Sequence, residues 1–264
     1  MSRTPTRTRM RIPIRTADVA LATQARTIAA SVDNSSQLPS LQHLRLLHLA
    51  SPALPIGGFH FSQGLEYAVD CGWVRDETSA LDWIGGIAES SMATLDLPVL
   101  YRLHAAWKRN DYLDVQRWNA FLIASRETAE LRAEDRHLGS ALLRVLVEMQ
   151  LTTELFGANP AKHPVGVAHA TAFAFACANW QLDASAAAQT FAWAWTENQV
   201  LAAVKLVPLG QSAGQRLLHA LIPRMAAYSA RAADLLDADI GVCTALNAVA
   251  SGRHEIQYTR LFRS

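Results

Sequence analysis

The apolar spacing between Trp118 and Met149 narrows the possible folds more than any other feature of this chain. Apolar and small residues recur there at the interval that one face of an α-helix requires. Two such stripes are present, formed by Trp118, Leu122, Ser125 and Ala129 and then by Leu138, Leu142, Val145 and Met149. A single helix would exceed about thirty residues, far above the usual length. We therefore predict two helices, separated by a break between Glu134 and Gly139.

Helix start and stop signals predict further helices on both sides of this run. A short helix is expected before Gly72, and Asp76 is placed to cap one that runs through Met92. Pro98 suits the first turn of the next helix, where a missing N–H costs little. Helices are also expected over Val165 to Asn179 and, capped by Asp183, to about Val204.

The two ends of the helical region have weaker signals. A helix is expected to begin at Ser40. Ser212 and Gln215 fit an S-x-x-Q capping box, and Pro223 is expected to kink or split the helix that follows. From Gly241 onward the helical spacing is lost.

These patterns predict an all-α fold, because no run alternates between apolar and polar residues as a half-buried strand does. We expect a single globular helical-bundle domain of about eight to ten helices over residues 41–240. A flexible Arg-rich arm over residues 1–40 precedes it, and an irregular tail over residues 241–264 follows. In the arm, Arg3, Arg7, Arg9, Arg11 and Arg15 come before the first acid, Asp18. A transit peptide, a disordered basic arm and an over-long start all remain open.

Composition excludes several classes of function. The chain has 264 residues, of which 50% are apolar and 18% charged, and its net charge is +1. That charge gives no case for binding nucleic acid or a membrane surface. Cys71, Cys177 and Cys243 are far apart, which argues against a disulfide framework and a cysteine zinc site. The apolar run Val165 to Ala178 is too short to cross a bilayer. We expect a reducing, cytoplasmic location.

Motifs for cofactor or metal binding are weak. The chain has no G-x-x-x-x-G-K-[ST] motif, and its nine histidines do not pair one helical turn apart. Asp234, Asp237 and Asp239 lack the glycine and the terminal glutamate of a calcium loop. We therefore predict no cofactor and no tight metal site. A weak site built from distant residues or across a dimer stays open.

One formal catalytic match is Gly210 to Gly214, which fits the G-x-S-x-G nucleophile elbow of the α/β-hydrolases. Aspartates at 234 to 239 and His254 follow in that family's order. The elbow needs a strand before it, and Val204 to Val207 is the sole candidate. A serine hydrolase using Ser212 is therefore kept as a remote alternative.

A Pro/Gly-rich stretch from Ser51 to Glu66 separates two helical regions. Its two prolines prevent a regular helix, and Gly57 and Gly58 free the backbone. Phe59, Ser62 and Gln63 follow directly. The residues alone allow an ordinary turn between helices or a loop that presents these side chains to a partner.

Charged and aromatic residues elsewhere allow similar alternatives. Arg126 and Glu130 are one turn apart, so they form either an ion pair on a solvated helix face or a charged rim around an interface. Lys205, between apolar neighbours, is either a surface lysine or a contact residue at an apolar binding face. The tail from Tyr258 to Arg263 is either frayed or an interface anchor.

Four stretches of the chain resemble the urease accessory protein F family. They are SPALPIGGFHFSQGLEYAVDCGWV from Ser51, WNAFLIASRETAELR from Trp118, AWTENQVLAAVKLVPLGQSAGQRLL from Ala194, and the terminal HEIQYTRLFRS. They occur in order and cover about residues 41–264. The first 40 residues have no counterpart. Where the family often has Tyr or Ser, this chain has Phe59-His60-Phe61, which keeps the aromatic character without a hydroxyl group.

The resemblance implies an all-α protein that turns over no substrate and acts in the maturation of urease, a nickel enzyme. It implies a homodimer that binds the accessory scaffold protein D, called H in some organisms. That complex recruits the nickel-carrying accessory GTPase G to the urease apoprotein for nickel insertion. In a second version the protein activates or gates the GTPase, and an arginine finger is the usual device for activation. Arg126, Arg132, Arg216 and Arg260 are the candidates.

The resemblance also implies partner-binding residues, and it favours a presented recognition loop over a plain turn. The candidates for a GTPase-facing or dimer surface are Gly57, Gly58, Phe59, Ser62, Gln63 and Glu66, together with Lys205, Pro208, Gly210, Gln211 and Gln215. The candidates for docking on the scaffold are Tyr258, Arg260, Leu261, Phe262 and Arg263. Arg126 and Glu130 are the candidates for a charged rim.

Overall fold

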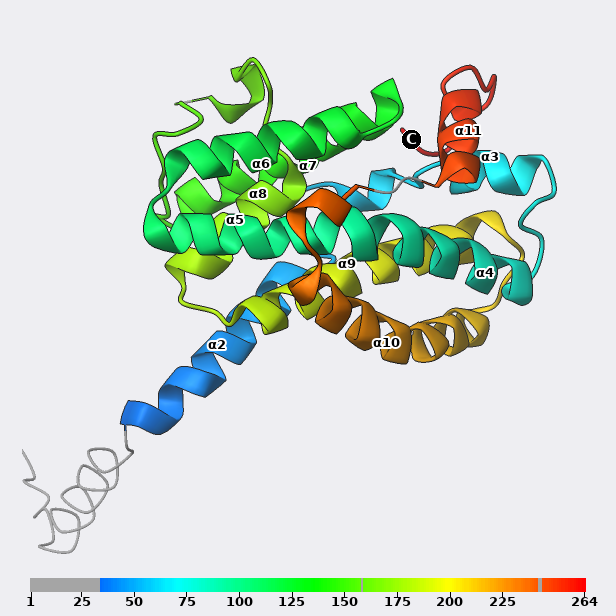
Figure 1. Cartoon of the computed structure of the whole chain (residues 1–264). Coiled ribbons are helices and arrows are strands. Elements are labelled where there is room, and N and C mark those ends of the chain that lie inside the picture. The colour runs from blue at the N-terminus through cyan, green and yellow to red at the C-terminus, as the bar shows by residue number, and fades with distance from the viewer. Residues whose placement is uncertain (1–33, 158, 242–243) are drawn as a thin grey trace, which may run out of the picture. The chain divides into compact units, whose positions relative to one another are not determined.

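The computed structural model describes residues 34–157, 159–241 and 244–264. Within these ranges the chain is built from helices and contains no strand, which confirms the all-α prediction (Figure 1). No helix there is long and apolar enough to cross a membrane. The chain divides into two units, Met1–His43 and Leu44–Ser264. The predicted arm falls largely on residues 1–33, outside the described residues, but helix α2 (Asn34–Ala50) begins before Ser40.

Several helices begin where their capping residues predict. Helix α4 (Glu77–Ile87) has a capping box, in which Asp76 accepts from Ser79 N and the Ser79 side chain accepts in return. Helix α5 (Leu97–Arg109) carries Pro98 in its first turn. Helix α9 (Ala184–Leu206) is capped by Asp183, which accepts from Ala186 N at 2.9 Å. Each cap satisfies backbone donors that have no partner inside the helix.

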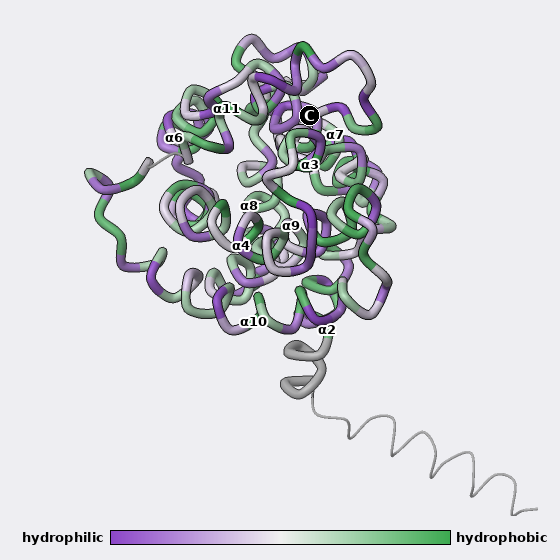
Figure 2. The backbone as a smooth tube through the Cα atoms, turned by 90° about the vertical axis from the view of Figure 1, so that its right-hand side faces the viewer, coloured by the Kyte–Doolittle hydropathy of each residue, from purple (hydrophilic) through white to green (hydrophobic). Residues whose placement is uncertain are grey.

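The core forms around helices α8 (His169–Asn179) and α9. Every residue of α8 from Ala170 to Ala178 is buried, and the alanines among them let neighbouring helices approach closely. Helix α5 packs on α8, and α10 (Gln211–Asp234) packs on α9. Figure 2 shows α8 and α9 in the middle of the body, with α6, α7 and α10 towards the outside.

Between α4 and α5 the chain forms a π-helix, η2 (Ala88–Asp96), with no intervening loop. A π-helix of this kind is uncommon and often marks a functional site. Its last residue, Asp96, is buried. Three shorter 3₁₀ helices lie within the described ranges, at Gly58–His60 (η1), Pro160–Lys162 (η3) and Asp237–Asp239 (η4).

The break in the long apolar run was predicted at the wrong place. Helix α6 (Tyr112–Ser125) ends, and α7 (Ala129–Glu148) begins, on either side of Arg126 to Thr128. Thr128 caps α7 by accepting from Leu131 N at 3.2 Å. Gly139 lies inside α7, where a Cβ atom would come within 2.1 Å of the Val167 carbonyl oxygen. It is a close-approach glycine, not a helix stop.

The ends of three other helices also differ from the predictions. Helix α8 starts at His169, after Gly166 turns the chain with a φ of +84°. Helix α10 begins after Gly210, so Ser212 lies in its first turn and is not a cap, and the helix continues through Pro223 without a split. Helix α11 (Ala245–His254) forms where helical spacing is absent. It packs against α3 (Leu65–Asp70), a tertiary contact that local spacing cannot reveal.

The two glycines Gly139 and Gly86 provide a matched test of this packing. We expect Gly139→Ala to lower the free energy of unfolding by about 1–3 kcal/mol or more, because α7 must move away from the backbone of Val167. Gly86 lies in α4 with no atom within 4 Å of an added Cβ. Gly86→Ala should therefore raise stability by about 0.5–1 kcal/mol. Urea unfolding followed by circular dichroism gives both values, and equal effects would contradict the close approach.

Candidate functional site

The loop from Gly57 to Glu66 turns one aromatic ring outward and the other inward. Gly57 and Gly64 adopt left-handed φ angles of +77° and +81°, which glycine adopts readily. A Cβ on Gly64 would also come within 2.9 Å of Ser251 N on α11. Between these turns, Phe59 is 57% exposed while Phe61 is buried. The loop thus presents Phe59 and is anchored through Phe61.

The C-terminal tail lies directly on this loop. Arg263 N donates to the His60 carbonyl oxygen at 2.8 Å, and Ser62 N donates to the main-chain oxygen of Ser264 at the same distance. The Ser62 hydroxyl donates to that oxygen at 2.5 Å. Ser264 is fully buried. These bonds pair residues two hundred positions apart, so the tail is part of the folded body.

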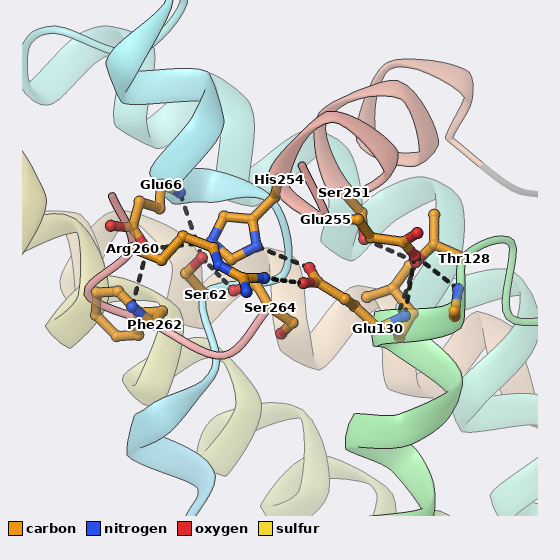
Figure 3. A network of polar contacts seen from close by, with 12 residues as sticks. Ser62, Glu66, Thr128, Glu130, Ser251, His254, Glu255, Arg260, Phe262 and Ser264 are labelled. Carbon is orange, nitrogen blue, oxygen red and sulfur yellow. Dashed lines mark hydrogen bonds and ion pairs between the residues drawn. The ribbon is translucent and has the colours of Figure 1, made fainter. Parts of the chain in front are cut away.

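A cluster of charged side chains holds the tail from its other side (Figure 3). Glu66 on α3 accepts from Leu261 N at 2.6 Å and from Phe262 N at 2.9 Å. Glu130 on α7 accepts from Arg260 at 2.7 Å. His254 on α11 lies between the two carboxylates, 3.1 Å from Glu66 and 2.7 Å from Glu130. Residues from three helices and the tail therefore meet in one network.

The end of helix α9 joins the same arrangement through Lys205. Its ammonium group lies 5.1 Å from the centre of the Phe262 ring, within the range of a cation–π interaction. Asn198, also on α9, donates to the Phe61 carbonyl oxygen at 3.3 Å. These contacts join the loop, the end of α9 and the tail. We define the junction surface as six exposed residues of these three segments: Phe59, Lys205, Tyr258, Arg260, Leu261 and Arg263.

A small cavity of about 140 Å³ is lined in part by Gly58, Phe59 and Gln63 of the loop. Arg126, Asp96 and Asp135 also line it. Arg126 Nε donates to Asp135 at 2.9 Å, and its terminal nitrogens bond to Asp96. Burial acts to lower the pKa of Arg126, but the two carboxylates outweigh it and raise that pKa well above its ordinary value. Arg126 therefore stays charged between two buried acids.

The predicted pairing of Arg126 with Glu130 is therefore wrong. Arg126 has an extended backbone between α6 and α7, so the two residues are not on one helix. Arg126 turns inward to Asp96 and Asp135, while Glu130 bonds to His254 and Arg260.

Glu134 connects the cavity with both the loop and the tail. It accepts from Gln63 at 2.7 Å and from the Ser264 hydroxyl at 2.8 Å. Gln63 in turn accepts from the Trp195 indole at 2.8 Å. Burial raises the pKa of Glu134 to about 7 despite these donors. Burial lowers the pKa of His169, which also lines the cavity, to about 4, so this imidazole is neutral near neutral pH.

The structure separates the predicted site residues into surface and interior groups. Ser62, Glu66 and Phe262 are buried, and the Arg126 side chain is 16% exposed. Gly57, Gly58, Gln63 and Glu130 are partly exposed. The exposed candidates are Phe59, Lys205, Pro208, Gly210, Gln211, Gln215, Tyr258, Arg260, Leu261 and Arg263. Pro208 to Gln215 follow Lys205 in the chain. Lys205 contacts the tail through the Phe262 ring.

Four residues that hold the site together were not among the predicted site residues: Asp96, Glu134, Asp135 and His254. The adjacent acids Glu134 and Asp135 beside the apolar stripe of α7 were the available signal, because buried acids need partners. Asp96 and His254 gave no such signal, since their partners lie far away in the sequence.

The structure provides no setting for the hydrolase chemistry considered for Ser212. The residues before it belong to helix α9 and a short turn, whereas a nucleophile elbow follows a strand. The serine hydrolase alternative is therefore wrong. Among the described residues, no group of three His, Cys, Asp or Glu side chains could hold a metal ion.

Comparison with known proteins places the chain in a family. The UreF family model matches residues 74–222. The urease accessory protein UreF of Alkalilimnicola ehrlichii is 45% identical over 226 residues, which are 86% of this chain and 97% of that protein. That of Azoarcus sp. (strain BH72) is 48% identical over 222 residues, 84% of this chain and 95% of its own. This chain belongs to the UreF family.

Family membership confirms the resemblance drawn from the four sequence stretches. The relatives are named as accessory proteins, which confirms the prediction that this UreF-family chain is not an enzyme. The span of the UreF model begins after the loop and ends before the tail. The matched span contains Lys205. It also contains the buried ion pairs of Arg126 with Asp96 and Asp135.

We expect Arg126→Met to be strongly destabilising in this UreF-family protein. The change leaves Asp96 and Asp135 buried without their cation, which costs about 3–5 kcal/mol of the free energy of unfolding. Arg216→Met is the matched control, because Arg216 pairs with Glu77 in exposed surroundings. It should change stability little. Similar losses in both variants would show that the buried cluster is not special.

Because the pKa of Glu134 is raised on folding, we expect the free energy of unfolding to depend on pH. Its pKa rises from an ordinary 4.5 to about 7 on folding, so folding takes up a proton between these values. Its contribution is therefore present at low pH and lost as the pH rises through about 7. Glu134→Gln should be more stable than the native chain at pH 8 by on the order of 1–3 kcal/mol, and this advantage should vanish near pH 4.5. Urea unfolding across this range measures it; an advantage independent of pH would contradict the assignment.

Proposed function

We propose that this UreF-family protein is a helical scaffold for urease maturation. In this proposal it binds the accessory scaffold protein D or H, and the complex recruits the nickel-carrying GTPase G to the urease apoprotein for nickel insertion. The supporting observation is the junction surface, where three segments distant in sequence meet beside exposed aromatic and cationic groups. The relatives' names, urease accessory protein UreF, supply the enzyme that is matured.

The composition of the junction surface suits a protein partner. Phe59, Tyr258 and Leu261 are apolar or aromatic and exposed, with Tyr258 fully so. Lys205, Arg260 and Arg263 lie among them. Aromatic residues and arginine are the types enriched at interface centres, and they dominate hot spots. Buried hydrogen bonds to Ser62 and Glu66 fix the backbone below, so little order has to be gained on binding.

Different parts of this surface suit different partners. We assign the tail to the accessory scaffold. The loop and the exposed segment from Lys205 to Gln215 are assigned to the GTPase or to a second copy in a homodimer. Because the tail is bonded to the loop, the contact with the accessory scaffold and the contact with the GTPase or second copy would lie side by side.

Regulation of the GTPase is the second candidate function. Of the four arginines considered as a finger, Arg126 is held between buried acids and Arg132 bonds to the Arg126 carbonyl oxygen. Arg216 and Arg260 have exposed side chains. Because a finger must reach the partner's nucleotide, these two are the remaining candidates. Faster GTP turnover by the partner, lost on changing one of them, would favour this role over a scaffold.

Substitutions on the junction surface test the scaffold proposal. We expect Phe59→Asp and Leu261→Asp each to weaken binding to the accessory scaffold or the GTPase by about tenfold or more, because a charge replaces a buried apolar contact. Leu113→Asp is the control, since Leu113 is 80% exposed on α6, outside this surface. Co-expression followed by mass measurement of the complexes reads out assembly. An intact complex with both surface variants, or no complex with the native chain, would refute the proposal.

A further inference from the structure

His254 is a buried imidazole with a carboxylate on each side. The residue is fully buried, with Nδ1 2.7 Å from Glu130 Oε2 and Nε2 3.1 Å from Glu66 Oε2 (Figure 3). A neutral imidazole has one N–H donor and one acceptor nitrogen, and an ionised carboxylate only accepts. Both contacts are hydrogen bonds to ionised carboxylates only when Nδ1 and Nε2 each carry a proton. The geometry therefore fits the imidazolium, bonded to two carboxylates.

The same two carboxylates hold the tail. Glu66 accepts from Leu261 N and Phe262 N, and the second oxygen of Glu130 accepts from Arg260. Glu66 and Glu130 come from α3 and α7, so the ring between them fixes how the two carboxylates are spaced. With His254 charged, two cations balance two anions in this cluster. The position of the tail thus depends on a proton bound to His254 on α11, and not on a proton bound to a residue of the tail.

We propose that His254 is a proton-controlled latch that holds residues 260–264 on the loop and releases them when the proton is lost. Without that proton, a lone pair of the ring faces a carboxylate oxygen, and the remaining cation, Arg260, is bonded to Glu130 and not to Glu66. Like charges close together and an unpaired buried group both disfavour the closed form. The consequence for partner docking rests on the proposed function, because the released tail includes four residues of the scaffold contact.

Other titratable and charged groups face the cluster or the tail, and their effects can be separated. They are Arg253, Glu255, Lys205, Glu134, His60 and His137. Glu255 is exposed and accepts from Ala129 N and Glu130 N. Glu134 also loses a proton near pH 7, which disfavours its buried position beside Ser264, but His254→Gln leaves this titration in place. Burial and then Arg263 lower the pKa of His137. Loosening at high pH that disappears in His254→Gln therefore points to His254.

Hydrogen exchange of the tail amides tests the latch in the full chain without any partner. The N–H groups of Leu261 and Phe262 are bonded to Glu66, so exchange reports their release directly. Rates are measured at about pH 6 and about pH 9 and are divided by those of an unstructured peptide of the same sequence. We expect their protection to fall by about ten- to a hundredfold at the higher pH. Amides of α8 should keep theirs.

Three variants decide whether His254 is responsible. His254→Gln removes the titrating ring, so the fall in protection should disappear. Glu130→Gln puts an amide donor opposite Nδ1, which accepts from it when the ring is neutral, and keeps an acceptor for Arg260. It should therefore hold the tail at the higher pH and reduce the fall, even if His254→Gln does not fold. His137→Gln, an exposed histidine beside Phe61, is the control and should keep the fall.

Equal protection of the native tail at both pH values would overturn the latch. An undiminished fall in Glu130→Gln, or in folded His254→Gln, would do the same. None of these measurements involves a partner protein. A failed latch therefore leaves the proposed scaffold function standing, and a failed complex leaves the latch standing.

Discussion

The pairing of buried charge is the constraint on which the rest of this structure depends. Arg126 lies in the short connection between α6 and α7 and bonds to Asp96 at the end of η2 and to Asp135 on α7. A lone charge in such a place is very costly, whereas a charge with two hydrogen-bonded partners is tolerated. The three side chains therefore fix where the chain between α6 and α7 turns and how α7 faces η2. The loop and the tail are then built on α7, through Glu130 and Glu134.

Glu130 and Glu134 are one turn apart on α7, and this spacing explains how one helix supports two surface segments. Glu130 reaches His254 and Arg260, and Glu134 reaches Gln63 and Ser264. The loop and the tail are also bonded to each other through Ser62. A disturbance of the buried cluster would therefore be felt at the junction surface, although no exposed residue belongs to that cluster.

Local signals predicted the fold well, and contacts distant in the sequence account for the errors. Asp76, Asp183 and Pro98 act through neighbours a few residues away, so their sequence context is sufficient to place a helix start. The sequence predicts a helix break that reaches Gly139, because it does not show the Val167 backbone beside this glycine. The sequence predicts that the loop and the tail are partner-binding segments, which stays a prediction. That they bond to each other could not be read from the sequence, because more than two hundred residues separate Ser62 from Ser264.

The π-helix η2 sets the angle between the packing face of α4 and the packing face of α5. It lies between them without a loop, and α4 packs mainly on α10 whereas α5 packs mainly on α8. In an ordinary helix each residue turns the chain by about 100°, so the wider turns of η2 set the angle between the face used by α4 and the face used by α5. Losing one residue from Ala88–Asp96 would barely shorten this rod. It would rotate everything on one side of η2 against the other and carry Asp96 away from Arg126.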